Sequence, residues 1–273
     1  MKRILTAVVV LPFLIASILI SSLWWVFLAL AVAAMVLALW EFYLLAKRLQ
    51  LKPDPAAGYI AGAALVTIAL QNDPALNVLL VQFVIIALTA GTLIAATLRG
   101  APFDKMIPSV GATILGVLYI PLLGSHLISI RTGFNPNLSA HLLSFFFLVL
   151  MGADAGAYYI GRALGKHKLA PSISPGKTWE GAVGGLLAAL AMGVLAHFWF
   201  FRELPLKYIL PLAAVMTIVG IFGDLAESAL KRGAGAKDAA NILPGHGGML
   251  DRLDSLLFNA PLLYYFARFY FQS

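Results

Sequence analysis

The chain has 273 residues, of which 61% are hydrophobic and only 11% are charged. Soluble globular domains carry about 25% charged residues, so the composition predicts an integral membrane protein and excludes an ordinary soluble domain. The absence of cysteine excludes disulfides and thiolate metal sites. The formal net charge of +7 suits an anionic partner, although basic residues also orient membrane proteins.

Apolar runs of roughly the 20 residues that a membrane helix needs recur along the chain. They predict an all-α, polytopic membrane protein with about nine transmembrane helices. The predicted spans are residues 4–20, 23–39, 57–70, 76–98, 107–130, 140–162, 178–201, 206–230 and 252–271. The third run is the shortest, so its boundaries are the least defined.

The basic residues predict the orientation of these spans. With the N-terminus in the cytoplasm, 15 Lys and Arg residues fall on the cytoplasmic side and four on the other side. Cytoplasmic loops are enriched in Lys and Arg, so this distribution supports a cytoplasmic N-terminus. We expect a multi-pass protein of the cell inner (cytoplasmic) membrane whose active site faces the cytoplasm.

Acidic residues are distributed unevenly along what we predict to be a single membrane domain (residues 1–273). Eight of the twelve lie between Asp154 and Asp254. We therefore expect residues 1–139 to form mainly scaffold helices. Residues 140–273 are the expected catalytic half, with a cytoplasmic signature loop at 228–254.

Four polar residues share one face of the predicted helix at 206–230, because Asp224, Glu227, Ser228 and Lys231 follow helical spacing. Two carboxylates on one face indicate a cation site, since Mg²⁺ takes one or two carboxylates together with substrate phosphates. For Glu227 an intrahelical ion pair with Lys231 is the alternative. Asp224 lies a turn deeper in the apolar segment, where an unpaired carboxylate is costly.

A glycine-rich loop, which also contains Pro244, follows this helix over residues 233–250. Its end, at residues 246–248, precedes the last predicted helix, so free N–H groups at that N-terminus are available to phosphate. Asp251 and Asp254 lie in the opening turns and are candidates to hold a metal ion that bridges phosphates. Helix capping explains one of these two carboxylates but not both.

A second polar cluster lies between the sixth and seventh spans. Residues 174–181 predict a turn into a helix, with Lys177 and Thr178 at its mouth, and lysine at such a position binds phosphate well. Solvated lysines of a cytoplasmic loop are the alternative, and Lys166 and Lys168 fit that interpretation. Three small residues of the following helix indicate close helix packing rather than ligand binding: Gly181, Gly184 and Gly185.

The segment from residue 228 to residue 254 resembles the signature of phosphatidate cytidylyltransferases, also called CDP-diacylglycerol synthases. That signature has Ser, Lys-Arg, Lys-Asp, a small residue, His-Gly-Gly and Asp-Arg-x-Asp at fixed spacings. The matching residues are Ser228, Lys231, Arg232, Lys237, Asp238, Ala240, His246, Gly247, Gly248, Asp251, Arg252 and Asp254. The run at 174–181 also resembles the family, with Gly176 where lysine is frequent.

The resemblance implies the reaction of CTP with phosphatidate to give CDP-diacylglycerol and pyrophosphate. It also implies Mg²⁺, with room for a second cation, and a homodimer in the lipid bilayer that takes phosphatidate from the cytoplasmic leaflet; no nucleic acid is expected as a partner. In such a reaction a lipid phosphate oxygen attacks the α-phosphorus of CTP. Two anions must meet, so charge neutralisation and positioning dominate catalysis.

We assign roles to the residues of both clusters on this basis. The predicted catalytic residues are Asp224, Lys231 and Asp251, and the predicted metal ligands are Asp224, Asp251 and Asp254. The predicted substrate-binding residues are Ser174, Lys177, Thr178, Ser228, Arg232, Lys237, His246, Gly247, Gly248 and Arg252.

Two other functions stay open beside this assignment. A CTP-dependent polyprenol or lipid kinase would use similar residues, because composition alone does not separate it from a cytidylyltransferase. A transporter of a phosphorylated lipid or anion would place polar residues at matching midplane positions of two repeats, whereas here they gather on one side of one half. A CDP-alcohol phosphatidyltransferase is excluded, because its motif needs four aspartates and only Asp154 lies in the relevant region.

Overall fold

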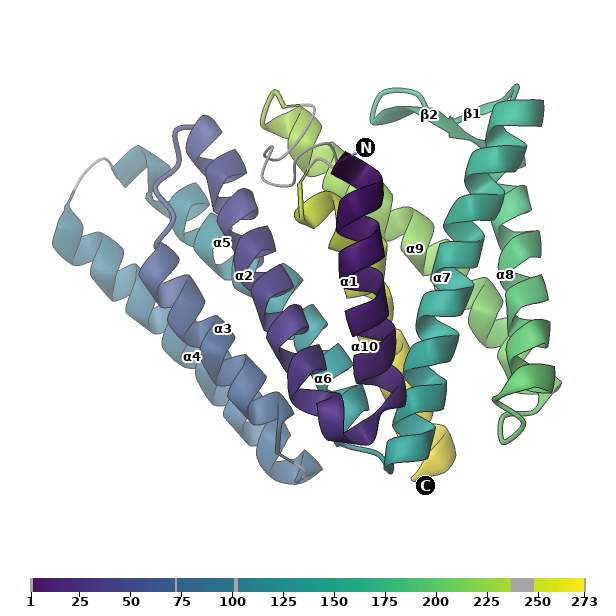
Figure 1. Ribbon diagram of the computed structural model, residues 1–273. Helices are drawn as coiled ribbons and strands as arrows, with labels where there is room; N and C mark the ends of the chain where they lie inside the picture. The colour runs from purple at the N-terminus through teal and green to yellow at the C-terminus, as the bar shows by residue number, and fades with distance from the viewer. Residues whose placement is uncertain (1, 72, 101–102, 237–247, 273) are drawn as a thin grey trace.

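The computed structural model describes residues 2–71, 73–100, 103–236 and 248–272, and it is built almost entirely of helices (Figure 1). Three short segments join or interrupt these helices: the 3₁₀ turns η1 (Ser21–Leu23) and η2 (Phe103–Lys105), and the π-helical turn η3 (Leu118–Leu122). The α-helices are α1 (Lys2–Leu19), α2 (Trp24–Arg48), α3 (Pro55–Ala69), α4 (Pro74–Arg99), α5 (Met106–Val117), α6 (Leu123–Thr132), α7 (Pro136–Leu164), α8 (Trp179–Trp199), α9 (Leu206–Gly233) and α10 (Leu250–Phe271).

Within the described residues, six helical segments are long and apolar enough to cross a membrane. They are Ser21–Arg48, Ala75–Arg99, Phe103–Thr132, Pro136–Leu164, Trp179–Trp199 and Leu206–Gly233, with Pro55–Ala69 as a shorter apolar helix. The prediction of a mostly helical, multi-pass membrane protein is therefore confirmed. Helices also occupy the other predicted spans, but nine crossings and a cytoplasmic N-terminus stay predictions.

The expectation of an all-α fold is wrong in one place, where a two-stranded antiparallel hairpin joins α7 to α8. Strand β1 (Lys168–Ala170) pairs with β2 (Ser174–Thr178), with Lys168 opposite Thr178. Pro175 and Gly176 disfavour a helix in this run, and the polar sequence is too short for one. The Thr178 hydroxyl then accepts the Gly181 N–H at 3.1 Å and caps α8.

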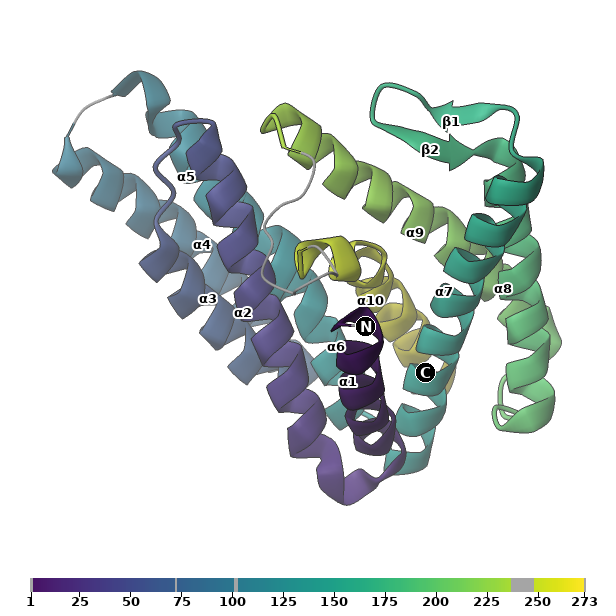
Figure 2. The same cartoon turned by 45° about the horizontal axis from the view of Figure 1, so that its top comes forward.

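The helices form a bundle with α3 and α4 along one edge and α7 and α8 along the other (Figures 1 and 2). Helices α9 and α10 run between these two pairs in both views. Helices α7 and α8 pack closely because the α8 glycines have no side chain. A Cβ on Gly185 would lie 2.9 Å from the Ala153 carbonyl oxygen, and one on Gly184 would overlap Ile160. The predicted packing role of the α8 glycines is thus confirmed.

Candidate active site

The polar face of α9 is present as predicted. The Lys231 Nζ atom lies 2.8 Å from Glu227 Oε2, one helical turn away. The Ser228 hydroxyl lies 3.4 Å from Asp224 Oδ1, where it donates a long hydrogen bond. The Glu227 side chain is 1% exposed and points into the protein, whereas the Asp224 side chain is 42% exposed.

Helix α10 adds a third carboxylate to this face. One carboxylate oxygen from each of Asp224, Glu227 and Asp254 lies within 4.8 Å of the others, and we call these three residues the acidic cluster. The close approach depends on Gly223 of α9, since a Cβ there would lie 2.7 Å from the Asp254 carbonyl oxygen. Any larger residue at 223 would push α10 away and widen the cluster.

Two lysines from different elements lie at the acidic cluster. The Lys177 Nζ atom, on β2, is 2.7 Å from Asp224 Oδ2. The Lys231 Nζ atom is 2.5 Å from Asp251 Oδ1 as well as close to Glu227. Both lysine side chains are mostly buried, with 22% and 14% exposed. The site therefore combines several carboxylates with two cations, and Asp224, whose side chain is 42% exposed, is the most accessible carboxylate of the acidic cluster.

Asp224, Asp254 and Lys177 line a pocket of about 580 Å³ between α7, β2, α8, α9 and α10. The volume lies within the range of about 300–1,000 Å³ that is typical of small-molecule sites. Its polar lining includes most of the predicted site residues that the structure describes, together with Asp154 of α7 and several glycines. These polar residues are Asp154, Tyr158, Arg162, Ser174, Lys177, Thr178, Thr217, Asp224, Asp251, Asp254 and Ser255.

Asp251 shares Lys231 with Glu227 of the acidic cluster and also accepts a backbone N–H. Besides its ion pair with Lys231, its Oδ2 atom accepts the Gly248 N–H at 3.0 Å. It therefore caps the start of α10 and orients Lys231. Its predicted role as a metal ligand stays a prediction, and Glu227 holds the third position of the cluster.

The other predicted substrate-binding residues are placed less centrally. Arg232 Nε donates to the Ile173 carbonyl oxygen at 3.3 Å and so ties α9 to the hairpin. Arg252 is exposed on the first turn of α10. Three further predicted residues lie outside the described part of the chain: Lys237, His246 and Gly247.

The role assignment made from the sequence leaves out two acids that the structure places here. For Glu227 the sequence left two alternatives open, a cation site or an ion pair with Lys231. In the structure Glu227 belongs to the acidic cluster and also pairs with Lys231. Asp154 lines the pocket from α7. The signal for Asp154 was present, because an ionisable residue inside an apolar helix usually faces the protein interior or an aqueous cavity.

The acidic cluster fits a divalent metal ion. Mg²⁺ prefers oxygen ligands, and three carboxylates from two helices supply them. Among the described residues, the Glu227 Oε1 atom is buried and has no hydrogen-bond partner. A buried carboxylate oxygen without a partner is costly, and a cation would satisfy it.

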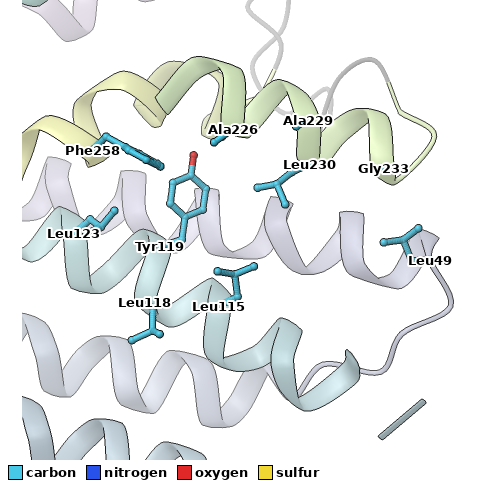
Figure 3. Close-up of a pocket in the computed structure, with 10 residues that line it drawn as sticks. All are labelled: Leu49, Leu115, Leu118, Tyr119, Leu123, Ala226, Ala229, Leu230, Gly233 and Phe258. Atoms are coloured by element: carbon cyan, nitrogen blue, oxygen red, sulfur yellow. The ribbon is translucent and has the colours of Figure 1, made fainter. Parts of the chain in front are cut away.

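A second pocket, of about 630 Å³, lies on the other face of α9 (Figure 3). The only side-chain oxygen among its lining residues is the hydroxyl of Tyr119, which points toward α9 and α10. Such a lining suits hydrocarbon and not a nucleotide. The lining residues are Leu49, Leu115, Leu118, Tyr119, Leu123, Ala226, Ala229, Leu230, Gly233 and Phe258.

Comparison with known sequences identifies the family. The sequence pattern of the group described as the cytidylyltransferase family matches residues 1–270. The chain belongs to the cytidylyltransferase family. The match covers nearly the whole chain and includes every described site residue.

Several curated relatives are named phosphatidate cytidylyltransferase. The protein of Bacillus subtilis (strain 168) is 43% identical over 159 residues, which are 57% of this chain and 57% of the relative. That of Haemophilus influenzae is 42% identical over 136 residues, 48% of this chain and 47% of the relative. That of Brucella suis biovar 1 is 51% identical over 123 residues, 45% of each. The chain thus spans about half the length of the curated relatives it matches.

Proposed function

We propose that this protein transfers the cytidylyl group of CTP to phosphatidate, giving CDP-diacylglycerol and pyrophosphate. The observation that carries the proposal is the acidic cluster beside a 580 Å³ pocket, which Asp224, Asp254 and Lys177 line. Lys231 lies next to this pocket and pairs with Glu227 and Asp251. Membership of the cytidylyltransferase family and the names of the relatives support the same reaction.

The pocket chemistry suits a reaction between two anions. A phosphatidate oxygen forms a bond to the α-phosphorus of CTP, while the bond from that phosphorus to the β-phosphate oxygen breaks and pyrophosphate leaves. The nucleophile is already ionised at neutral pH, so no strong general base is needed. Lys177 and Lys231 are placed to neutralise phosphate charge and to hold the reacting groups in line.

Mg²⁺ is part of this proposal. Asp224, Glu227 and Asp254 would hold it, with Asp251 keeping Lys231 oriented beside them. When bound, the ion would neutralise phosphate charge and stabilise the transition state by several kcal/mol. Chain residues would bind and orient the two substrates around it, with Ser174 and Thr178 in the lining of the pocket.

We further propose that the pocket opens to the cytoplasm at the inner membrane, that phosphatidate enters from the cytoplasmic leaflet and that the enzyme is a homodimer. The bias of basic residues supports the orientation. Because the chain has no cysteine, single introduced cysteines test it cleanly. A Lys168→Cys variant should react with a membrane-impermeant maleimide only after the cells are opened. The matched Arg202→Cys variant should react in intact spheroplasts, and the reverse pattern would overturn the orientation.

The reaction itself is tested with CTP labelled at different phosphates. Purified protein, phosphatidate vesicles and Mg²⁺ should move label from α-³²P-CTP, but not from γ-³²P-CTP, into the lipid extract. The Asp254→Asn variant is the matched negative control. Transfer of the γ-label would instead indicate a lipid kinase. Transfer of neither label would refute catalysis and point to transport or binding.

A further inference from the structure

Glu41 is the carboxylate that links the first half of the chain to the candidate site. It lies on α2 and its side chain is fully buried. Its Oε1 atom accepts the Met249 N–H at 2.8 Å, and its Oε2 atom accepts the Leu250 N–H at 2.7 Å. A side chain from the predicted scaffold therefore receives the first N–H groups of α10, about 200 residues later in the chain.

This contact is favourable for two physical reasons. The first turn of a helix has N–H groups without partners inside the helix and carries partial positive charge. A buried carboxylate is strongly unfavourable unless it is paired and hydrogen-bonded. The carboxylate therefore supplies acceptors for the free N–H groups, and these N–H groups supply hydrogen bonds to the buried charge. Lys231 also attracts the same carboxylate electrostatically. The pair fixes where α10 begins.

Gly248, which precedes α10, leaves room for the Glu41 carboxylate because it has no side chain. A Cβ on Gly248 would lie 2.6 Å from Glu41 Oε2 and 3.1 Å from its carboxyl carbon. Contacts below 3.0 Å are not tolerated, so either the carboxylate or the start of α10 would have to move. The second glycine of the Gly-Gly pair is thereby explained by packing against Glu41.

The consequence reaches the site through the first two turns of α10. Asp251 and Asp254 follow Leu250 directly, and they contact Lys231 and the acidic cluster respectively. We propose that Glu41 is a positioning residue, which anchors the N-terminus of α10 and thereby holds Asp251 and Asp254 against α9. Its catalytic consequence rests on the proposed function, whereas the anchoring itself does not.

The test compares Glu41→Gln with Glu203→Gln, a matched change at a half-exposed glutamate that pairs with His141. Hydrogen exchange measures the anchor directly. Amides 249–254 should exchange faster in Glu41→Gln, while peptides from α7 and α8 and the melting temperature in detergent stay as in the parent. Affinity for Mn²⁺ and kcat should each fall about 10- to 100-fold, as expected for a group that orients a metal ligand. Glu203→Gln should change none of these.

A second pair of variants keeps the inference testable if Glu41→Gln does not fold. Gly248→Ala should produce the same local exchange and loss of Mn²⁺ affinity. Glu41→Asp, which withdraws the carboxylate, should partly relieve Gly248→Ala, so the two effects should not add.

Three results would overturn the proposal. Unchanged exchange at 249–254 in both Glu41→Gln and Gly248→Ala would mean that Glu41 does not anchor α10. Faster exchange with unchanged Mn²⁺ affinity and kcat would make the contact merely structural. Additive effects of Glu41→Asp and Gly248→Ala would show that the two residues are not coupled. If no cytidylyl transfer is found, the proposed function fails while hydrogen exchange still decides the anchor.

Discussion

Arg131 and the acidic cluster are two buried charged sites whose charges are satisfied in different ways. The Arg131 side chain, 5% exposed, donates to the carbonyl oxygens of Ser17, Ile20 and Ser21 at 3.2–3.4 Å. These carbonyls end α1 and follow it, where a helix leaves acceptors unpaired. This turn lies at the end of the bundle away from the β1–β2 hairpin (Figure 1).

The acidic cluster is paired with side chains instead, and two of its residues, Asp224 and Asp254, line a pocket. Its partners are Lys177 and Lys231, and one buried oxygen of Glu227 has no hydrogen-bond partner among the described residues. Fixed backbone carbonyls accept the hydrogen bonds of Arg131 that the structure shows. Side-chain ion pairs that border 580 Å³ of space can instead open to receive a ligand. The comparison separates a charge that stabilises the fold from charges that are available for chemistry.

The largest effect should come from removing a carboxylate of the cluster. Asp224→Asn and Asp254→Asn should each lower kcat/KM at least about 100-fold, or about 2.7 kcal/mol, because a metal ligand is lost. Melting temperature in detergent should change little, since the variants stay isosteric. If both variants keep more than roughly a tenth of the parent rate, about 1.4 kcal/mol, the cluster does not hold a catalytic metal.

Replacing the lysine that joins Glu227 to Asp251 should have the next largest effect. Lys231→Ala should lower kcat about 10- to 100-fold with a smaller change in KM, because Lys231 orients the carboxylates and meets charge in the transition state. Lys166→Ala and Lys168→Ala are matched controls at exposed positions and should leave both constants near parent values. A change confined to the KM for CTP would place Lys231 in binding alone.

Arg131 should show the opposite pattern. Arg131→Met keeps an unbranched apolar stem but removes the donors to three carbonyls, so the free energy of unfolding should fall by about 1–3 kcal/mol. Turnover per folded molecule should stay unchanged, as measured after aggregate is removed. The exposed Arg202→Met is the control for loss of charge. A lower kcat in folded Arg131→Met would erase the distinction between the two sites.

The smallest effect concerns an ion pair outside the membrane spans. Burial alone would raise the pKa of the Asp54 carboxyl, but the Ala57 N–H and the Arg99 guanidinium outweigh it and hold that pKa below its ordinary value. A depressed pKa contributes stability that is present above the unfolded value of about 3.9 and is lost as pH falls through the folded value.

Arg99→Gln should accordingly reduce stability by well under about 1 kcal/mol at pH 7, since Arg99 is 63% exposed. Melting temperatures of parent and variant should converge as pH falls below about 4. A difference that persists unchanged in acid would assign the effect to packing.

Most of the helical architecture follows from the sequence, because long apolar runs leave the backbone few alternatives in a membrane. The hairpin at 168–178 was not predicted, since its short polar strands have no alternating pattern to mark them. A single helix was expected over 107–130, and the structure interrupts it with the π turn Leu118–Leu122 that contains Pro121, a residue without an N–H to donate.

In the candidate site, contacts within one helix could be predicted from the sequence, and contacts between distant segments could not. Helical spacing alone brought Asp224, Glu227 and Lys231 to one face, because neighbours at i+3 and i+4 are fixed by the helix. Which acid joins Asp224 and Asp254 depends on how α10 crosses α9, and spacing along one chain segment does not contain that crossing. Glu41 was missed for the same reason, since its partners lie about 200 residues away.

The most direct test of the acidic cluster is Mn²⁺ binding to the purified protein, followed by electron paramagnetic resonance with and without CTP. Carboxylate sites for Mg²⁺ also accept Mn²⁺. We expect the parent to bind Mn²⁺, and Glu227→Gln and Asp254→Asn to weaken binding more than Asp251→Asn, whose carboxylate faces Lys231. Lys168→Ala should bind as the parent does. Unchanged Mn²⁺ affinity in both Glu227→Gln and Asp254→Asn would contradict the claim that this cluster is the metal site.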